Sequence, residues 1–213
     1  MKKFLFAALL ALSGRAFARI PSPAFDPPES GNHVAVLAGG CFWAMQGTFQ
    51  HVKGVVSATA GYAGGAAANA NYRAVSAGNT GHAESVKIVY DASHISYGKL
   101  LEIFFSIAHD PTEIDRQGPD EGPQYRSEIF ATDEMQKKTA ESYIAQLERA
   151  KVFHGKIATK VSLLPAFYPA EDYHQNFETL HPYYPYIVIN DLPKISHLKR
   201  DYPGLYTSTP SPY

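Results

Sequence analysis

Cys41 is the residue best able to do chemistry, and it is the only cysteine among 213 residues. It lies in Gly39-Gly40-Cys41-Phe42-Trp43, between a short apolar run and a segment with helical spacing of apolar residues. Unpaired N–H groups and the helix dipole at the start of a helix favour a thiolate, which is the nucleophilic form. A lone cysteine is also often a buried structural residue. The two glycines, which let a substrate approach, and the Phe-Trp pair favour the nucleophile.

Five short blocks of sequence resemble the type A peptide methionine sulfoxide reductase family. They are GGCFW at 39–43, GYAGG at 61–65, GHAE at 81–84, QGPD at 117–120 and QYRS at 124–127. Their order and spacing match the family over residues 33–192, and the GCFW and GHAE blocks together are highly specific. Enzymes of this kind return methionine sulfoxide to methionine. The chain therefore resembles a single-cysteine form of the family, and the resemblance implies action on the S epimer of the sulfoxide.

The resemblance implies a role for each of seven residues. The nucleophile is Cys41, the acid is Glu84, the pocket for the substrate methyl group is formed by Phe42 and Trp43, and the site is completed by Tyr72, Asp120 and Tyr125. The chemistry agrees with these roles, because a sulfoxide sulfur is a poor electrophile until its oxygen is protonated or strongly hydrogen-bonded. Glu84 must then be neutral, and partial burial would raise its pKa in that direction.

Each of these residues has a simpler interpretation when it is considered alone. Glu84 begins a strand and resembles an exposed edge carboxylate. Tyr72 and Tyr125 are two of 14 tyrosines, and most tyrosines are packing residues. Asp120 follows a proline, as turn residues often do. Only their joint spacing favours a functional site.

The cysteine count also determines how the enzyme is recycled. Many relatives carry recycling cysteines, whereas this chain has one cysteine, so no internal disulfide can form. We expect an external thiol reductant, either a thioredoxin-like protein or another dithiol, and no bound cofactor. His82, His109 and His174 lie beside acidic residues but lack the tight spacing of metal ligands, so no metal is expected.

Periodicity predicts the elements that hold these residues. Strands are expected at 34–38, 55–62, 85–90, 127–131 and 157–163, and helices at 42–52, 97–107, 134–152 and 171–180. Ser96 and Asp133 are the expected caps of two of these helices. The order predicts an α+β fold, a two-layer split βαβ (ferredoxin-like) sandwich with a long irregular C-terminal tail. Residues 66–83 and 109–126 are expected to be loops.

The N-terminus has the three parts of a secretory signal peptide. Met1-Lys2-Lys3 precedes the apolar residues 4–12, and Ala16-Phe17-Ala18 is a cleavage site. The apolar run is far shorter than the roughly 20 residues that span a bilayer, which argues against a membrane anchor. We expect a cleavable signal peptide at 1–18, a proline-rich linker at 19–32, a catalytic domain at 33–192 and a tail at 193–213. The protein would then be exported to the periplasm or the extracellular space.

The charge balance limits the partners. The formal net charge is −1, and cleavage would make it more negative, so no nucleic-acid partner is expected. Oxidised methionine in proteins or peptides and a thiol-donating redox protein are the expected partners, with no membrane association after cleavage and a monomeric state. Two alternatives remain open: a single-cysteine thiol peroxidase, and a non-catalytic peptide-binding module that uses the Tyr/Pro-rich tail.

Overall fold

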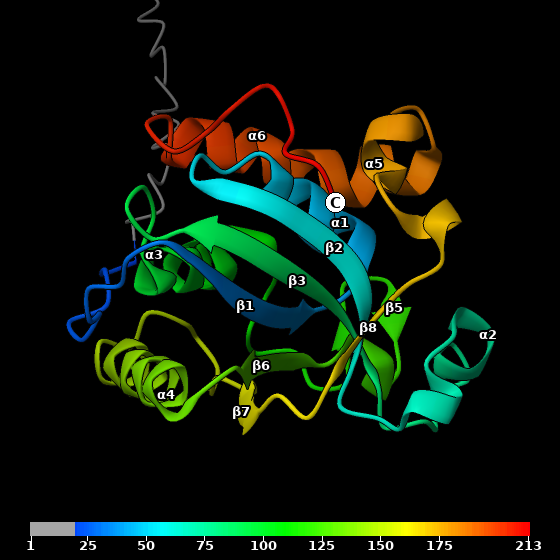
Figure 1. The fold of residues 1–213 in the computed structure, drawn as a ribbon, viewed down its shortest axis with the longest axis horizontal. Helices are drawn as coiled ribbons and strands as arrows, with labels where there is room; N and C mark the ends of the chain where they lie inside the picture. The colour runs from blue at the N-terminus through cyan, green and yellow to red at the C-terminus, as the bar shows by residue number, and fades with distance from the viewer. Residues whose placement is uncertain (1–19) are drawn as a thin grey trace, which may run out of the picture.

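A six-stranded sheet in the order β7-β6-β1-β3-β2-β8 forms the centre of the molecule (Figure 1). The computed structural model describes residues 20–213, so the expected signal peptide at 1–18 lies outside the described residues. The strands of this sheet are β1 (Asn32–Gly39), β2 (Val55–Ala63), β3 (Ala83–Asp91), β6 (Ser127–Ala131), β7 (Lys160–Leu163) and β8 (Phe167–Pro169).

The four central strands have the split βαβ arrangement. β1 is antiparallel to both of its neighbours, β3 and β6, and β2 is antiparallel to β3. β1 and β2 therefore run in the same direction with β3 between them, and α1 (Phe42–Gln50) makes the crossover. Two edge strands enlarge the sheet, since β7 pairs parallel to β6 and β8 pairs antiparallel to β2. The predicted α+β class is confirmed.

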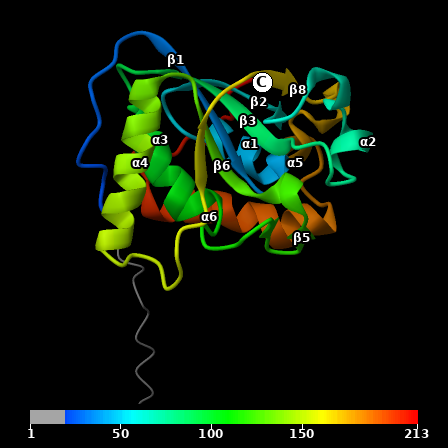
Figure 2. The ribbon, with the colours of Figure 1, turned by 90° about the horizontal axis from the view of Figure 1, so that it is seen from below.

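The alternation of side chains along β1 explains why the sheet has two unequal faces. Ala35 and Leu37 belong to the main core, whereas Val36 and Ala38 belong to a small second cluster with Phe130. Successive residues of a strand point to opposite faces, so these two sets lie on opposite sides of the sheet. The main core also holds buried apolar residues from helices α1, α3 (Tyr97–Ile103) and α4 (Glu134–Arg149). Figure 2 shows α3 and α4 side by side.

Local capping places the helices where the sequence predicts them. The Ser96 side chain accepts a hydrogen bond from the Lys99 N–H, and Asp133 accepts one from the Gln136 N–H, so both expected caps are present. α3 continues directly into a π-helical turn, η2 (Phe104–Ala108). The expected long helix at 134–152 ends at Arg149, three residues early.

The C-terminal tail is the main departure from the predicted fold. Residues that we expected to be coil form the π-helical turn η5 (Ile187–Asp191) and helix α6 (Leu192–Asp201), coloured orange-red in Figure 1. α6 packs against α1 and buries Leu198. Pro193 lies near the start of α6, directly after the π-helical turn η5. Leu198 is the one residue of this helix that is fully buried.

The two predicted loops also contain short elements. The first loop holds the 3-10 turn η1 (Ala67–Asn69) and α2 (Tyr72–Val75). The second holds the two-residue strands β4 (Arg116–Gln117) and β5 (Asp120–Glu121) and the turn η3 (Pro123–Tyr125). The expected helix at 171–180 is divided into η4 (Asp172–His174) and α5 (Phe177–Leu180) by Asn176, whose φ of 54° is left-handed.

The proline-rich segment before β1 has no regular structure but is held against the folded body. Asp26 accepts a hydrogen bond of 2.9 Å from the Gly98 N–H at the start of α3. Glu29 accepts one of 2.6 Å from the Tyr90 hydroxyl on β3. These contacts make residues 20–31 part of the domain surface rather than a free linker. Within residues 20–213, every helix is too short or too polar to cross a bilayer.

Candidate active site

The junction of β1 and α1 places Cys41 at the N-cap of the helix. Gly40, the preceding residue, has φ +95°, which side chains rarely adopt. A Cβ at position 40 would also lie 2.6 Å from the Gln117 side chain, so the close approach of the β4 segment requires glycine. The tight turn brings Cys41, partly exposed, to the end of the sheet.

The electrostatic surroundings of Cys41 differ from our expectation. Burial raises the pKa of the thiol well above its ordinary value, and the nearby carboxylates of Glu84 and Asp191 raise it further. A hydrogen bond from the backbone of Trp43 at the helix start lowers the pKa, as expected, but it is outweighed. The helix start thus favours the thiolate as expected, but burial outweighs it, and Cys41 in the free enzyme is a thiol at neutral pH.

Glu84 is buried at the start of β3, with 2% of its surface exposed. Because β3 is a central strand between β1 and β2, the simple interpretation of Glu84 as an edge carboxylate is wrong. Its Oε2 accepts a hydrogen bond of 3.0 Å from the backbone N–H of Phe42, one residue after Cys41. Burial raises the pKa of Glu84 to about 8, so at neutral pH most molecules carry a proton on this carboxyl group.

Tyr72, Tyr125 and Asp120 come from three separate short elements and meet near the sulfur. Tyr72 begins α2, and its backbone N–H donates to Glu171 at 2.9 Å. Burial raises the pKa of both tyrosines, and the charges of Glu84 and Cys41 raise it further, which shows that both phenols lie close to these groups. Both hydroxyls are thus protonated donors.

Asp120 and Tyr186 form a hydrogen-bonded pair at the edge of the same site. The Tyr186 hydroxyl donates to the Asp120 carboxylate. Burial raises the pKa of Asp120, although the Tyr186 hydroxyl opposes that change. Cys41 is among the groups that act electrostatically on Tyr186, so this pair also borders the sulfur.

The Trp43 ring is fixed by three aromatic side chains from the C-terminal part of the chain. It stacks on Phe177 with ring centroids 3.8 Å apart and an angle of 8°, and it meets Tyr186 edge-on at 6.1 Å. The indole N–H donates to Nδ1 of His174 at 3.2 Å. The His174 ring also lies 5.0 Å from the Phe42 ring. These rings form an apolar cage beside Cys41.

Sequence reasoning missed the structural role of His174, Phe177 and Tyr186. The sequence offers His174 only as a possible metal ligand, and it predicts a short helix around Phe177 and coil around Tyr186. The density of aromatic residues between positions 172 and 186 was the available indication. The expected site residues are all brought together: Cys41, Phe42, Trp43, Tyr72, Glu84, Asp120 and Tyr125.

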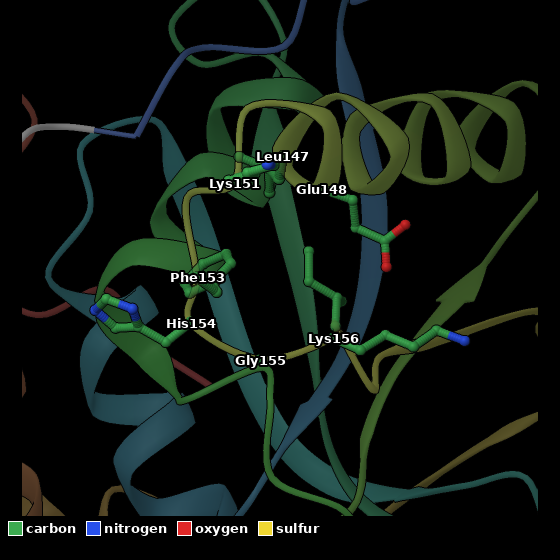
Figure 3. Close-up of a pocket in the computed structure, with 8 residues that line it drawn as sticks. Leu147, Glu148, Lys151, Phe153, His154, Gly155 and Lys156 are labelled. Atoms are coloured by element: carbon green, nitrogen blue, oxygen red, sulfur yellow. The ribbon is translucent and has the colours of Figure 1, made fainter.

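A cavity of about 440 Å³ lies elsewhere, at the C-terminal end of α4 (Figure 3). Its lining residues run from Leu147 to Ile157 and include none of the seven site residues. Among residues 20–213, no group of three or more His, Cys, Asp or Glu side chains is arranged to hold a metal ion.

Comparison with known proteins identifies the family. The family model for peptide methionine sulfoxide reductase matches residues 33–204. The chain is 56% identical over 180 residues to peptide methionine sulfoxide reductase MsrA 2 of Mesorhizobium japonicum, covering 84% of this chain and 92% of that protein. It is 52% identical over 188 residues to MsrA 2 of Synechocystis, covering 86% and 88% of the two chains.

Solved structures agree with these relatives. Reduced Mxr1 from Saccharomyces cerevisiae superimposes with a TM-score of 0.65 at 31% identity, covering 72% of this chain and 88% of that one. Methionine sulfoxide reductase A of Corynebacterium diphtheriae gives a TM-score of 0.62 at 33% identity, covering 74% and 79%. The matched range extends to residue 204 and so includes α6, whereas the sequence predicts a catalytic domain that ends at residue 192. On its sequence and its fold, the chain belongs to the peptide methionine sulfoxide reductase family, type A.

Proposed function

We propose that this protein reduces methionine S-oxide, free or in proteins, to methionine, with Cys41 as nucleophile and Glu84 as acid. One observation carries the proposal: a buried Glu84 that holds its proton at neutral pH is hydrogen-bonded to the same helix start that presents Cys41. The Phe42 and Trp43 rings border this point and supply an apolar surface for the substrate methyl group.

The chemical step follows from these positions. The Cys41 sulfur attacks the sulfoxide sulfur while Glu84 gives its proton to the sulfoxide oxygen, and the Tyr72 and Tyr125 hydroxyls donate hydrogen bonds to that oxygen. A bond forms between the two sulfur atoms, and the sulfur–oxygen bond of the substrate breaks as the oxygen is transferred to the Cys41 sulfur. Cleavage of the sulfur–sulfur bond then releases methionine and leaves Cys41 as a sulfenic acid. The proton lost by the Cys41 thiol replaces the one that Glu84 gave. Two electrons pass from the cysteine sulfur to the sulfoxide sulfur. The protonated state of Glu84 also helps the attack, because an ionised Glu84 would raise the pKa of the Cys41 thiol.

Recycling requires an external thiol because the chain contains one cysteine. A thiolate of the reductant attacks the Cys41 sulfenic acid, water leaves, and a mixed disulfide forms. A second thiol of the reductant then breaks this disulfide and releases Cys41. We therefore propose a dithiol reductant, such as a thioredoxin-like protein, as the redox partner of a monomeric enzyme.

A single-turnover experiment tests this mechanism. Reduced protein is mixed with one equivalent of methionine sulfoxide in the absence of thiol, and then analysed by intact mass and with a sulfenic-acid trap. We expect one trapped oxygen on Cys41 for each methionine formed. Methionine formation with Cys41 still a free thiol would contradict the nucleophilic mechanism. Cys41→Ser is the matched control and should form no methionine.

Two further measurements separate the alternatives: competition between hydrogen peroxide and a methionine sulfoxide peptide, and alkylation of Cys41 in the folded protein. For a thiol peroxidase, hydrogen peroxide would outcompete a methionine sulfoxide peptide for Cys41, whereas the aromatic cage favours the peptide. For a peptide-binding module, Cys41 would resist alkylation in the folded protein. The partial exposure of Cys41 favours the enzyme.

We also propose that the protein is exported after cleavage behind Ala18. The motif in residues 1–18 supports this proposal. N-terminal sequencing of the mature protein tests it, and a mature chain that still begins at Met1 would contradict it.

A further inference from the structure

An exposed apolar surface lies next to the aromatic cage around Trp43. Eleven large apolar side chains are exposed among residues 20–213, and six of them lie between positions 173 and 189. Five of these six extend from the end of α5 into η5, with between 45% and 91% of their surfaces exposed, and we call them the apolar rim: Leu180, Tyr183, Tyr184, Val188 and Ile189. Exposed apolar side chains that are concentrated in one place mark interaction sites, whereas scattered ones do not.

Ring contacts join the apolar rim to the cage. The Tyr184 ring meets the Phe177 ring edge-on at 5.8 Å, and Phe177 is the residue that stacks on Trp43 at 3.8 Å. Val188 stands one turn after Tyr184, because its N–H donates to the Tyr184 carbonyl at 3.0 Å. Tyr186, which lies between these two along the chain, meets the Trp43 ring at 6.1 Å. The apolar rim is therefore continuous with the cage that would hold the substrate methyl group.

The segment that carries the apolar rim has no charged side chain. Residues 179–190 contain no Asp, Glu, Lys or Arg, although these four types make up 18% of the chain. Ionic contacts from this segment therefore cannot select what binds to it, and an occupant must match it through apolar contacts. Tyrosine suits such a surface, because its large ring loses little conformational entropy when it is buried by a partner.

The chemistry of methionine oxidation indicates which occupant is apolar. Methionine is mostly a buried residue, and its sulfoxide is polar, so oxidation disrupts the core that held the side chain. A polypeptide segment that becomes accessible through such damage carries the apolar neighbours that were packed beside the methionine. When the sulfoxide of that segment reaches Cys41, the residues on either side of it must lie on the surface around the cage, which includes the apolar rim.

We propose that the apolar rim binds the residues that flank methionine sulfoxide in an unfolded polypeptide, so that the enzyme prefers sulfoxides with apolar neighbours. The rim acts on substrate affinity, and no step of the reaction is assigned to it. The inference rests on the proposed function of the chain. Its test measures binding without turnover, so it can fail while reduction by Cys41 still holds.

Peptide binding to the Cys41→Ser variant tests the proposal. Trp43 is the one tryptophan of the chain, so its fluorescence reports the entry of a sulfoxide into the cage. Two short peptides with a central methionine sulfoxide are compared, one with Leu and Val on both sides of it and one with Ser and Gly. The apolar peptide should bind at least about fivefold more tightly. Salt concentration should change this ratio little, because apolar contacts are not screened.

Two substitutions in the apolar rim, each made in the Cys41→Ser background, identify the surface. Leu180→Ser and Ile189→Ser should each weaken binding of the apolar peptide by roughly three- to tenfold and change binding of the polar peptide much less. Both side chains are mostly exposed, so the fold should be kept, which circular dichroism checks. Met135→Ser is the matched control and should leave both affinities unchanged. Met135 is also exposed, but it stands on α4, which lies on the opposite side of the molecule from α5 in Figures 1 and 2.

Three results would overturn the proposal. The first is equal affinity of Cys41→Ser for the two peptides, and the second is an equal loss of affinity for both peptides in the rim variants, which would indicate a change in the cage itself. The third is unchanged peptide affinity in the rim variants. Loss of a dimer in sedimentation, or a raised KM for a protein reductant, would then assign the apolar rim to a second copy of the chain or to the reductant. A wild type that prefers the apolar peptide but does not reduce it would contradict the proposed function and support the binding surface.

Discussion

Replacing Glu84 by Gln tests the acid in both of its roles, chemical and electrostatic. The amide has nearly the same shape, and its carbonyl oxygen can still accept the Phe42 N–H that Glu84 accepts at 3.0 Å. It cannot transfer a proton, so the chemical step should slow by about 10² to 10⁴ with little change in substrate binding. In the wild type, turnover should fall as pH rises through about 8, where Glu84 loses its proton.

The raised pKa of Glu84 also makes the free energy of unfolding depend on pH. The difference between about 8 in the folded protein and 4.5 for the free group, at about 1.4 kcal/mol per pKa unit, is about 5 kcal/mol. Because the folded state binds the proton more tightly than the unfolded state, this contribution is fully present below pH 4.5 and is lost as pH rises through about 8. Glu178 and Asp191, whose pKa values are also raised, act in the same direction.

Urea unfolding of wild type and Glu84→Gln between pH 4.5 and 8.5 measures this difference. The wild type should lose up to about 5 kcal/mol more of its unfolding free energy over that range than the variant, which lacks the Glu84 titration. Parallel stability curves for the two proteins would refute the reasoning, because they would mean that Glu84 ionises normally in the folded state. Unchanged turnover with only weaker binding would separately refute the acid role.

Three further substitutions have defined outcomes. Cys41→Ser should abolish turnover in a sulfoxide reduction assay and keep the far-UV circular dichroism spectrum, because a hydroxyl is far less nucleophilic than a thiolate. Trp43→Ala should lower the specificity constant, because it opens the apolar cage around the substrate methyl group. The loss should correspond to roughly 1 to 3 kcal/mol of transition-state stabilisation, and an unchanged constant would assign Trp43 to packing alone. Gly47→Ala should lower the free energy of unfolding measured in urea, because the added Cβ displaces Glu178. This loss should exceed the gain from the higher helix propensity of alanine. In a Glu178→Ala background the same change should instead stabilise by about 1 kcal/mol.

Much of the fold could be predicted because its elements carry strong local patterns. The continuous apolar run of β1, the alternation in β3 and the apolar spacing in α1 and α3 each indicate an element that packs into the core. Ser96 and Asp133 mark helix starts through side-chain bonds that span only three residues. Such patterns are local, so they can be recognised before any tertiary contact is known.

Short elements and the C-terminal helix could not be predicted in the same way. β8 is three residues long and exists because its backbone pairs with the edge of β2. α6 has Leu198 as its one fully buried residue, and its place against α1 comes from contacts with segments about 150 residues away. Marginal helices of this kind depend on tertiary packing more than on propensity.

Some features of the active site also follow from the sequence, and others only from the tertiary structure. The sequence by itself determined that a single thiol stands at a helix start, that recycling must use an external thiol, and which blocks belong to the reductase family. Only the tertiary structure decided the protonation states, because these depend on desolvation and on charges brought together from distant segments. Burial keeps Glu84 mostly neutral, and burial, more than the charges of the neighbouring acids, raises the pKa of the Cys41 thiol. No local sequence pattern indicates which distant residues lie close to Cys41 and Glu84 in the folded protein.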